Sequence, residues 1–480
     1  AQERLCHSRP RRSLRGSSVP MCKETQAKAS QPREFTVEEV AKHSQAEDAW
    51  IIVDNVVYDV AKFLRSEVHP GGEVILTKAG KDATDVFHAY HPPYVARRKF
   101  PKYRLGVLKD APETPEIVKD FRAVRKAVED AGLYDVHWYH YLYWAWHVVY
   151  PGIFLAVGIN IFLSGAQHRA WYVLGGALVG LAQHQWAFIG HDGSHGAILQ
   201  KWGPDFALSI LCGTLGFGCS SSWWKYTHNQ HHVVTNEYDR DTDVTHLPFY
   251  AVSKHMLLSE RKGTPMGGKL QENFARLMVR IQAWTFFPVM LLVARASLLV
   301  NMLIMMFVTN KVPTMPWQTF HFPAVWKWAD RLAVLGHIMW VYIVFAHVVP
   351  EGHRFAAFLA HWVVVSSLHV QLVANHWERP NKFSQDEEDS WFVKEAVTGR
   401  NYECSWYDGW LHGGLEFQIE HHIFPRMPKY SLERCRDEFV RPLCEKWGVP
   451  YASTGFVHAV FDTWQHLKGV GAAAFDEKYD

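Results

Sequence analysis

Long apolar runs occur only in the middle of this chain, between about residue 141 and residue 374. Four of them approach the ~20 residues that a helix needs to cross a bilayer. They come as two closely spaced pairs, residues 141–163 with 170–189 and residues 332–350 with 355–374. Each pair predicts a helical hairpin that returns the chain to its starting side. We therefore expect about four transmembrane helices.

A fifth apolar run, residues 281–308, would make the number of spans odd. It carries Arg295 near its middle, and a charge at the bilayer centre costs roughly 2.5–3.5 kcal/mol on insertion scales. We expect this run to lie along the membrane interface or to pack against the protein. Residues 205–222 are apolar but short, and residues 223–280 and the chain beyond 374 are polar. These parts predict interfacial helices and a helical cap outside the membrane.

The first 140 residues are polar and charged, with short periodic segments. TVEEVAKH predicts a helix with Thr36 as N-cap. WIIVDNVVYDV, residues 50–60, predicts two strands around an Asp54-Asn55 turn. We therefore expect a small α+β domain over residues 35–110. A linker and an amphipathic helix should follow over residues 111–140.

Composition narrows the possible functions. The net charge of +2 argues against nucleic acid as a partner. The chain has 29 histidines, the commonest metal-ligating residue, and 21 tryptophans, which concentrate at membrane interfaces. Its seven cysteines contain no CxxC pair, which argues against a cysteine-based metal site. Residues 1–34 predict a disordered or targeting segment rather than a secretory signal, and residues 466–480 a flexible tail.

A compact motif occupies the second half of the α+β segment. HPGG at residues 69–72 places a histidine on a tight turn whose glycines let the backbone pass close to a flat cofactor. With AGKDAT at residues 79–84, it resembles the haem-binding core of cytochrome b5. The resemblance implies haem b with His69 and His91 as axial ligands, and electron transfer rather than O2 binding. His88 is the neighbouring alternative to His91 and is otherwise expected to face solvent.

Three histidine clusters, called here the histidine boxes, lie just beyond apolar segments. Within each box the ligand-type residues are three or four positions apart, so a helix would place them on one face. Neutral imidazoles suit iron, and no single box has enough ligands for two metals. We therefore expect the boxes to combine. The candidate ligands are His191 and His195 in HDGSH, His228, His231 and His232 in HNQHH, and Gln418, His421 and His422 in QIEHH.

These boxes resemble those of the membrane fatty acid desaturase and hydroxylase superfamily, which read HxxxH, HxxHH and H/QxxHH. The resemblance covers roughly residues 140–440 and implies an O2-dependent oxidoreductase with two irons held by the box residues. Gln418, with the N-terminal haem domain, resembles the front-end desaturases, which act at the delta-5, delta-6 or delta-8 position of a polyunsaturated fatty acid. The alternative is the related sphingolipid long-chain-base delta-8 desaturases, which it also resembles. Whether Gln418 binds iron directly or through water stays open.

Several other residues could belong to the site. His376 ends the last apolar run, where the superfamily supplies an extra histidine, and is a candidate iron ligand. His369 is expected to pack or to form a hydrogen bond, and His184 to lie in the core or behind the ligands. The acidic stretch at residues 237–243 predicts a solvated loop that caps helices. The alternative is that its carboxylates orient the box imidazoles. His412 is left without a role.

The predicted fold class is therefore an N-terminal α+β cytochrome b5-like domain followed by an all-α membrane desaturase domain over residues 141–465. The resemblance implies an acyl lipid or acyl-CoA substrate and electrons from an NADH-cytochrome b5 reductase. It also implies the endoplasmic reticulum with both termini cytosolic, although a plastid location stays open. Positive charge at residues 97–104 agrees with that orientation.

Two alternative functions compete with desaturation. A hydroxylase of the same superfamily shares the boxes. A histidine-rich metal transporter is the contrasting class, but transporter sites lie near the bilayer midplane on interrupted helices. The boxes lie at the ends of the predicted spans, and a haem domain has no role in transport.

Overall fold

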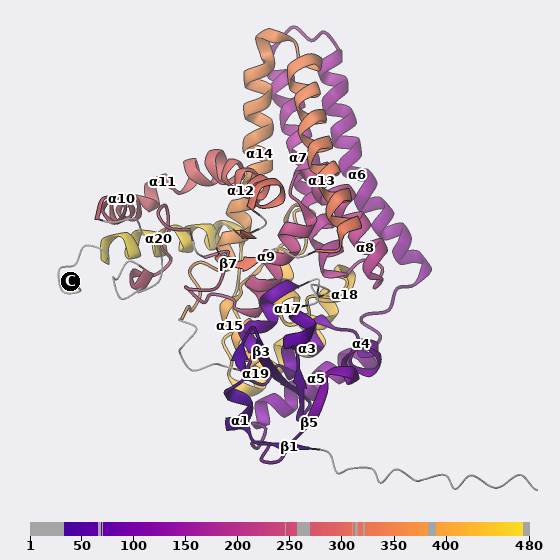
Figure 1. Cartoon of the computed structure of the whole chain (residues 1–480). Helices are drawn as coiled ribbons and strands as arrows, with labels where there is room; N and C mark the ends of the chain where they lie inside the picture. The colour runs from indigo at the N-terminus through magenta and orange to yellow at the C-terminus, as the bar shows by residue number, and fades with distance from the viewer. Residues whose placement is uncertain are drawn as a thin grey trace, which may run out of the picture.

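The computed structural model describes residues 33–65, 69, 71–244, 246–256, 269–309, 311–312, 315–319, 322–382 and 390–473. The expectations for residues 1–32 and 474–480 lie outside these residues. Figure 1 shows an upright helical bundle, a lower region that contains the N-terminal domain, and a helical arm at one side.

The N-terminal domain is built on a five-stranded sheet with the order β1-β5-β4-β3-β2, in which β1 and β5 are parallel. Asp54 and Asn55 have φ values of 53° and 60° and connect β3 to β4, as a two-residue hairpin requires. Thr36 caps α1 by accepting a hydrogen bond from the Glu39 N–H. Both sequence predictions are thus confirmed. The elements are β1 (Glu34–Phe35), α1 (Val37–Ala41), β2 (Ser44–Gln45), β3 (Asp48–Val53), β4 (Val56–Asp59), α2 (Ala61–Arg65), η1 (Gly72–Lys78), α3 (Thr84–Tyr90), α4 (Pro93–Arg98), η2 (Phe100–Tyr103) and β5 (Arg104–Leu108).

The predicted amphipathic helix is α5 (Glu116–Asp130). Its buried Phe121 stacks on Phe392 and Phe424, with ring centroids 5.5 Å and 6.1 Å apart. The helix therefore joins the core of the C-terminal cap. That cap includes α15 (Trp391–Thr398), α16 (Gly409–His412), η9 (Leu415–Phe417), α17 (Gln418–Ile423), α18 (Lys429–Cys435), η10 (Arg436–Val440) and α19 (Arg441–Trp447).

Four helices stand side by side in the upright bundle (Figure 1): α6 (Trp138–Leu163), α7 (Arg169–His195), α13 (Ala324–Ile343) and α14 (Arg354–Ala374). Helices α7 and α14 touch backbone to backbone, because a Cβ at Gly176 would lie 2.0 Å from the Ala357 carbonyl oxygen. The outer faces carry exposed apolar side chains, among them Val157, Met339 and Phe355. An apolar outer surface on hydrogen-bonded helices is what lipid requires.

Length and composition select a slightly different set of spans. Among the described residues, four helices are long and apolar enough to cross a membrane: Trp138–Leu163, Gln282–Thr309, Ala324–Val348 and Glu351–Ala374. Helix α7, which we predicted as a span, is missing from this set although it stands in the bundle. Its buried residues include the polar Gln183, His184 and Gln185, which lower its hydropathy.

The run around Arg295 lies across the bundle direction in Figure 1. It comprises α11 (Gln282–Pro288), η5 (Val289–Val293), α12 (Ala294–Ile304) and η6 (Met305–Thr309). Arg295 is buried and donates to the Phe217 carbonyl at 2.6 Å. This orientation agrees with the prediction that the run packs on the protein rather than spanning, whereas its hydropathy alone would class it as a span.

The remaining elements differ from an all-α domain with a free tail. Two short strand pairs occur, β6 (Lys311–Val312) with β7 (Met315–Thr319), and β8 (Asn401–Tyr402) with β9 (Ser453–Thr454). Helix α20 (Phe456–Ala473) extends beyond residue 466 and buries Leu467, so the predicted tail is wrong for residues 466–473. Helix α20 lies beside α10 (Lys269–Arg280) and α11 in the arm, near η4 (Lys254–Met256).

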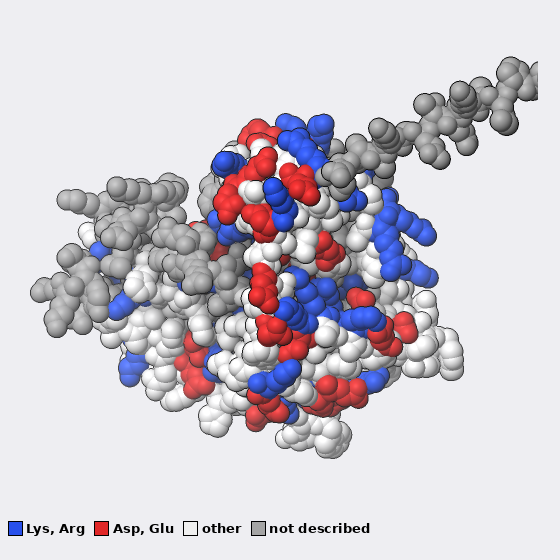
Figure 2. Space-filling model, turned by 90° about the horizontal axis from the view of Figure 1, so that it is seen from below, with Lys and Arg blue, Asp and Glu red and all other residues white. Residues whose placement is uncertain are grey.

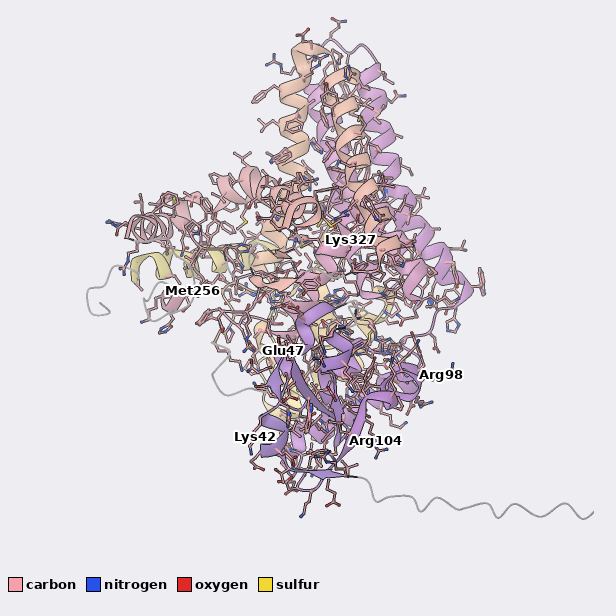
Figure 3. All side chains as sticks on the ribbon, in the orientation of Figure 1. Lys42, Glu47, Arg98, Arg104, Met256 and Lys327 are labelled. Atoms are coloured by element: carbon pink, nitrogen blue, oxygen red, sulfur yellow. The ribbon has the colours of Figure 1, made fainter. Side chains whose placement is uncertain are left out.

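The lower end of the molecule carries many charged side chains. Figure 2 looks at that end and shows basic and acidic side chains intermixed across it. In Figure 3, Lys42, Arg98 and Arg104 lie on the N-terminal domain, whereas Lys327 lies on α13 at the near end of the bundle. The N-terminal domain therefore lies at the charged lower end of the molecule.

Candidate functional site

The three histidine boxes lie on three helices that meet at the lower end of the bundle. Box one ends α7, box two is in α9 (Ser221–Val233) and box three is in α17. Helix α9 follows α8 (Trp202–Ser209) and the π-helical segment η3 (Ile210–Phe217), and the chain bends by 104° between η3 and α9. The buried Asp330 of α13 fixes this bend by accepting hydrogen bonds from the N–H groups of Ser221 and Ser222.

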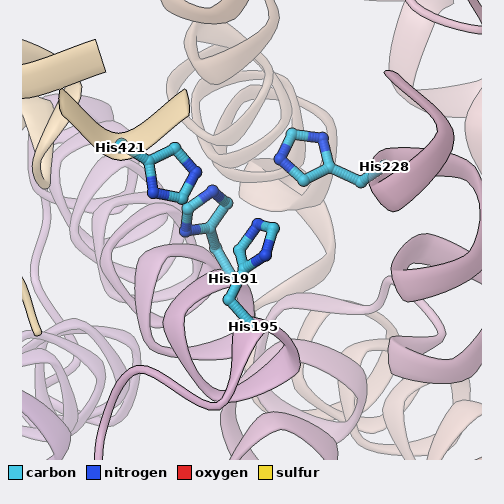
Figure 4. Close-up of side chains that lie close together, drawn as sticks. All are labelled: His191, His195, His228 and His421. Carbon is cyan, nitrogen blue, oxygen red and sulfur yellow. The ribbon is translucent and has the colours of Figure 1, made fainter. Parts of the chain in front are cut away.

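One cluster, the four-histidine cluster, consists of His191, His195, His228 and His421. One nitrogen from each ring lies within 4.8 Å of the others. Figure 4 shows the four rings converging from three separate segments. Both ring nitrogens of His195 and Nε2 of His421 are buried without a hydrogen-bond partner among the described residues. Because buried polar atoms are nearly always paired, these nitrogens fit a metal ion.

The second cluster, the three-histidine cluster, consists of His231, His376 and His422, again within 4.8 Å of one another. Gln418 completes it, since its side-chain nitrogen lies 2.9 Å from His376 Nε2 and 3.0 Å from His422 Nε2. Amide nitrogen and oxygen occupy equivalent positions when the amide is turned over. Gln418 can therefore present its oxygen to the same point that the two imidazoles face.

Hydrogen bonds fix the orientation of all three rings in this cluster. The Nδ1 of His231 lies 2.9 Å from the Asp241 carboxylate, and the Nδ1 of His422 lies 3.0 Å from Glu395. The Nδ1 of His376 lies 2.9 Å from the Thr398 carbonyl oxygen. An Nδ1–H that donates to such an acceptor leaves Nε2 with its lone pair for a metal.

His232 lies between the two clusters. Its ring stacks on His422 at 4.0 Å, and its Nε2 lies 3.0 Å from His228 Nε2. Its Nδ1 is buried without a partner among the described residues. All eight predicted histidine ligands, with Gln418, therefore come together in one place.

The other histidines considered from the sequence lie outside both clusters. His184 is buried and pairs with Gln371 at 2.9 Å. Gln371 also lies 3.4 Å from His412 Nδ1, which gives His412 a place in the same polar network. His369 belongs to neither metal group.

The acidic stretch corrects a prediction. We expected residues 237–243 to form a solvated loop, but Asp241 is fully buried. Besides His231, its carboxylate accepts hydrogen bonds from the N–H groups of Asn236 and Asp243 at 2.7 Å and 2.8 Å. The loop folds around this carboxylate because a buried charge must be fully hydrogen-bonded. The alternative interpretation, that acidic groups orient the imidazoles, is the one the geometry supports.

The haem-type pocket lies in the N-terminal domain. The rings of His69 and His91 face each other with centroids 5.9 Å apart. With metal–nitrogen bonds of about 2 Å, an ion between two imidazoles sets their ring centres about 6 Å apart. Each Nδ1 lies near a backbone carbonyl, that of Gly72 at 3.2 Å and that of Phe87 at 2.9 Å, which leaves both Nε2 atoms for the iron.

Burial keeps these two imidazoles neutral. It lowers the pKa of His69 to about 4 and the pKa of His91 to about 3, so both carry a free lone pair at neutral pH. His88 instead points to the surface and lies 2.9 Å from the Asp54 carboxylate. The pocket residues fit a bis-histidine haem with His91 rather than His88 as the second ligand.

The comparisons with known proteins agree with this geometry. Residues 169–455 match the model of the family "Fatty acid desaturase", and residues 36–109 match "Cytochrome b5-like Heme/Steroid binding domain". The chain belongs to the fatty acid desaturase family.

Two relatives and one solved structure illustrate the match. "Delta(8)-fatty-acid desaturase 2" of Arabidopsis thaliana is 31% identical, covering 94% of this chain and 96% of that protein. "Delta 8-(E)-sphingolipid desaturase" of Emericella nidulans is 28% identical, covering 72% of this chain and 60% of that protein. The solved cytochrome b5 of Ostreococcus tauri virus 2 is 45% identical, covering 16% of this chain and 99% of that one, with a TM-score of 0.15.

The groups behind the ligands were missed by sequence reasoning. In this desaturase, Glu395 is fully buried, yet nothing in its local sequence marks it. Asn401, on β8, fixes box three by accepting from the Ile419 N–H at 2.8 Å and donating to Glu420 at 2.8 Å. Only the acidic stretch at residues 237–243 offered a signal, as the alternative that its carboxylates orient the imidazoles.

Proposed function

We propose that this desaturase inserts a double bond into an acyl chain between an existing double bond and the carboxyl end. Two irons, held by the four-histidine cluster and by the three-histidine cluster with Gln418, would perform the chemistry. The observation that carries the proposal is the convergence of eight histidines and Gln418 directly beside a bis-histidine haem pocket. A hydroxylase remains the second candidate within the superfamily, with the same ligands.

The overall reaction fixes what must meet at this site. One hydrogen is removed from each of two adjacent methylenes. These two hydrogens, two further protons and two electrons reduce O2 to two waters. Iron bound in these clusters supplies the O2 chemistry that imidazole and carboxylate side chains lack. The chain's own contribution is to hold the imidazoles in one tautomer, through Asp241, Glu395 and the Thr398 carbonyl.

Electrons would reach the irons through haem b held by His69 and His91. We propose an NADH-cytochrome b5 reductase as the donor and the endoplasmic reticulum as the site, with both termini and all boxes cytosolic. Support comes from the common side of the N-terminal domain and the boxes relative to the bundle (Figure 1). Glycosylation tags inserted after Ser164 and near Glu351–His353 should be modified, whereas a tag in the linker at residue 111 should not. Modification at residue 111 would contradict this orientation.

Position 8 is the favoured site of attack, because the names of the Arabidopsis and Emericella relatives share it. The names differ in substrate, a fatty acid in one and a sphingolipid in the other. Expression in a yeast without the activity, fed single polyunsaturated fatty acids, should yield a product with one more double bond. Long-chain bases from the same cells should be analysed in parallel. A new delta-8 bond only in the long-chain bases would establish the sphingolipid alternative.

Metal analysis tests the centre itself. The purified protein should contain two non-haem irons per haem and should consume O2 in the presence of substrate and reductant. A hydroxylated product would favour the hydroxylase alternative. Zinc in place of iron, with no O2 consumption, would refute the proposed function.

A further inference from the structure

We propose that the ring of Tyr90 is the electron-transfer contact between the haem pocket and the histidine clusters. This inference rests on the proposed function, and it concerns which residue carries the electron. Tyr90 directly precedes His91 in the chain. Its ring lies edge-on to the ring of His232, with centroids 6.4 Å apart and planes at 84°. One peptide link and one ring contact therefore join a haem ligand to a residue of the metal centre.

His232 is well placed to couple the haem electronically to both clusters. It stacks on His422 of the three-histidine cluster and approaches His228 of the four-histidine cluster. The ring of His232 therefore contacts each cluster directly and links both to the haem domain.

The close approach of the two domains is built into the sequence at Gly72. This residue has φ +57°, and a Cβ there would lie 1.9 Å from Cε2 of Tyr226 on α9. The Glu73 N–H lies 3.4 Å from the Tyr226 hydroxyl. Val74 packs on Val233 and Val234, with Tyr90 at the edge of the same apolar patch. Arg426 donates to the Ala89 carbonyl at 3.3 Å. Tyr90 is thus held against His232 by contacts on both sides of it.

The environment of Tyr90 indicates that the ring conducts without being oxidised itself. Its hydroxyl is buried and has no hydrogen-bond partner among the described residues. A phenol loses its proton when it loses an electron, and no described group is placed to accept that proton. Each transfer therefore oxidises the haem iron by one electron and reduces the metal centre by one, and two transfers serve each double bond.

The test uses the full-length enzyme with both metals loaded. The haem is reduced without oxygen, the protein is mixed with O2 and substrate, and haem reoxidation is followed by its absorbance. Tyr90→Phe should keep the fast phase of the wild type, because it keeps the ring. Tyr90→Leu should lose the fast phase. Tyr94→Leu is the matched control, since Tyr94 is 52% exposed on the neighbouring α4, and it should behave as wild type.

Two further measurements separate electron transfer from damage. The low-spin haem spectrum and the haem midpoint potential should be the same in Tyr90→Leu and wild type. Protein that keeps its haem but lacks the two non-haem irons gives the baseline rate at which O2 alone reoxidises the haem.

The outcomes distinguish the two proposals. A wild-type rate no faster than the iron-depleted baseline would refute the proposed electron supply. A fast wild-type phase that survives in Tyr90→Leu would refute the role of Tyr90 alone. Slow reoxidation in Tyr90→Phe would also overturn it, because the hydroxyl rather than the ring would then matter.

Discussion

The two histidine clusters differ in how their rings are held. In the three-histidine cluster every Nδ1 has an acceptor within 3.0 Å, supplied by Asp241, Glu395 and the Thr398 carbonyl. In the four-histidine cluster, His191 has such a contact with Asp192 at 2.8 Å, but neither nitrogen of His195 has one among the residues that the structure describes. The protein therefore orients every ring of the three-histidine cluster through Nδ1, whereas His195 has no such contact among the described residues.

The difference matters because the ligand sets also differ. The three-histidine cluster has fewer imidazoles and includes Gln418, whose neutral oxygen is a weaker donor than imidazole. A site with weaker donors benefits more from side chains that are already oriented, because its weaker metal–ligand bonds offset less of the entropy lost when mobile side chains are fixed. The carboxylates behind His231 and His422 raise the basicity of these rings as well. We infer that the outer hydrogen bonds offset the loss of one imidazole.

The largest effect should follow removal of a candidate ligand whose ring has no hydrogen-bond partner among the described residues. His195→Ala deletes a neutral donor that no neighbour can replace, so activity should vanish and the four-histidine cluster should lose its iron. The content of non-haem iron should fall from two to one per haem, with an unchanged haem spectrum. Wild-type iron content in His195→Ala would show that the unpartnered nitrogens of His195 are not ligands.

A smaller loss should follow removal of an outer contact in the other cluster. Asp241→Asn removes the charge behind His231, and changes of this kind typically lower metal affinity or activity ~10–100-fold. Asp239→Asn, two residues away and outside both clusters, is the control. Iron affinity should be measured by competition with a chelator. Equal iron affinity in the Asp241 variant and the wild type would contradict the inference that the outer hydrogen bonds strengthen metal binding in the three-histidine cluster.

Substitutions at Gln418 test the effect of a stronger or a missing donor in the three-histidine cluster. Gln418→His adds a fourth imidazole to the three-histidine cluster but alters its geometry, so we expect reduced activity rather than none. Gln418→Ala offers no donor and should be less active still. Turnover and iron content of both variants give the order. Full activity in Gln418→Ala would show that the residue is structural.

The smallest effect should follow loss of the hydrogen bond between His88 and Asp54 on the surface of the haem domain. His88→Ala should keep the low-spin spectrum and lower the free energy of unfolding by ~0.2–1 kcal/mol, as exposed pairs do. The hydrogen bond from His88 lowers the pKa of Asp54. The wild type's advantage should therefore be present above the unfolded pKa of Asp54 and disappear as pH falls through its folded pKa. Denaturant unfolding at two pH values measures it. Loss of the spectrum in His88→Ala, with retention in His91→Ala, would reverse the axial assignment.

Local patterns were sufficient to predict several elements and to select the candidate ligands that the fold brings together. The Asp54-Asn55 turn, the Thr36 cap and the histidine spacing are each set by residues within a few positions of one another. Glu395, Asn401 and Asp330 were not predictable, because each acts on a box that is far away in the sequence. The buried polar face of α7 likewise needs the packed bundle, since hydropathy counts Gln183 and His184 against a span.

The close approach of Gly72 to the Tyr226 ring has a consequence for how the enzyme obtains electrons in a cell. It seats the electron donor on the enzyme that uses it, and residues 109–115 tether the two in one chain. A tethered partner acts at a fixed effective concentration, in the millimolar range for a short linker. Turnover should then be insensitive to how much separate cytochrome b5 a membrane contains. The same chain, placed in a host poor in that protein, should work as well as in a host rich in it.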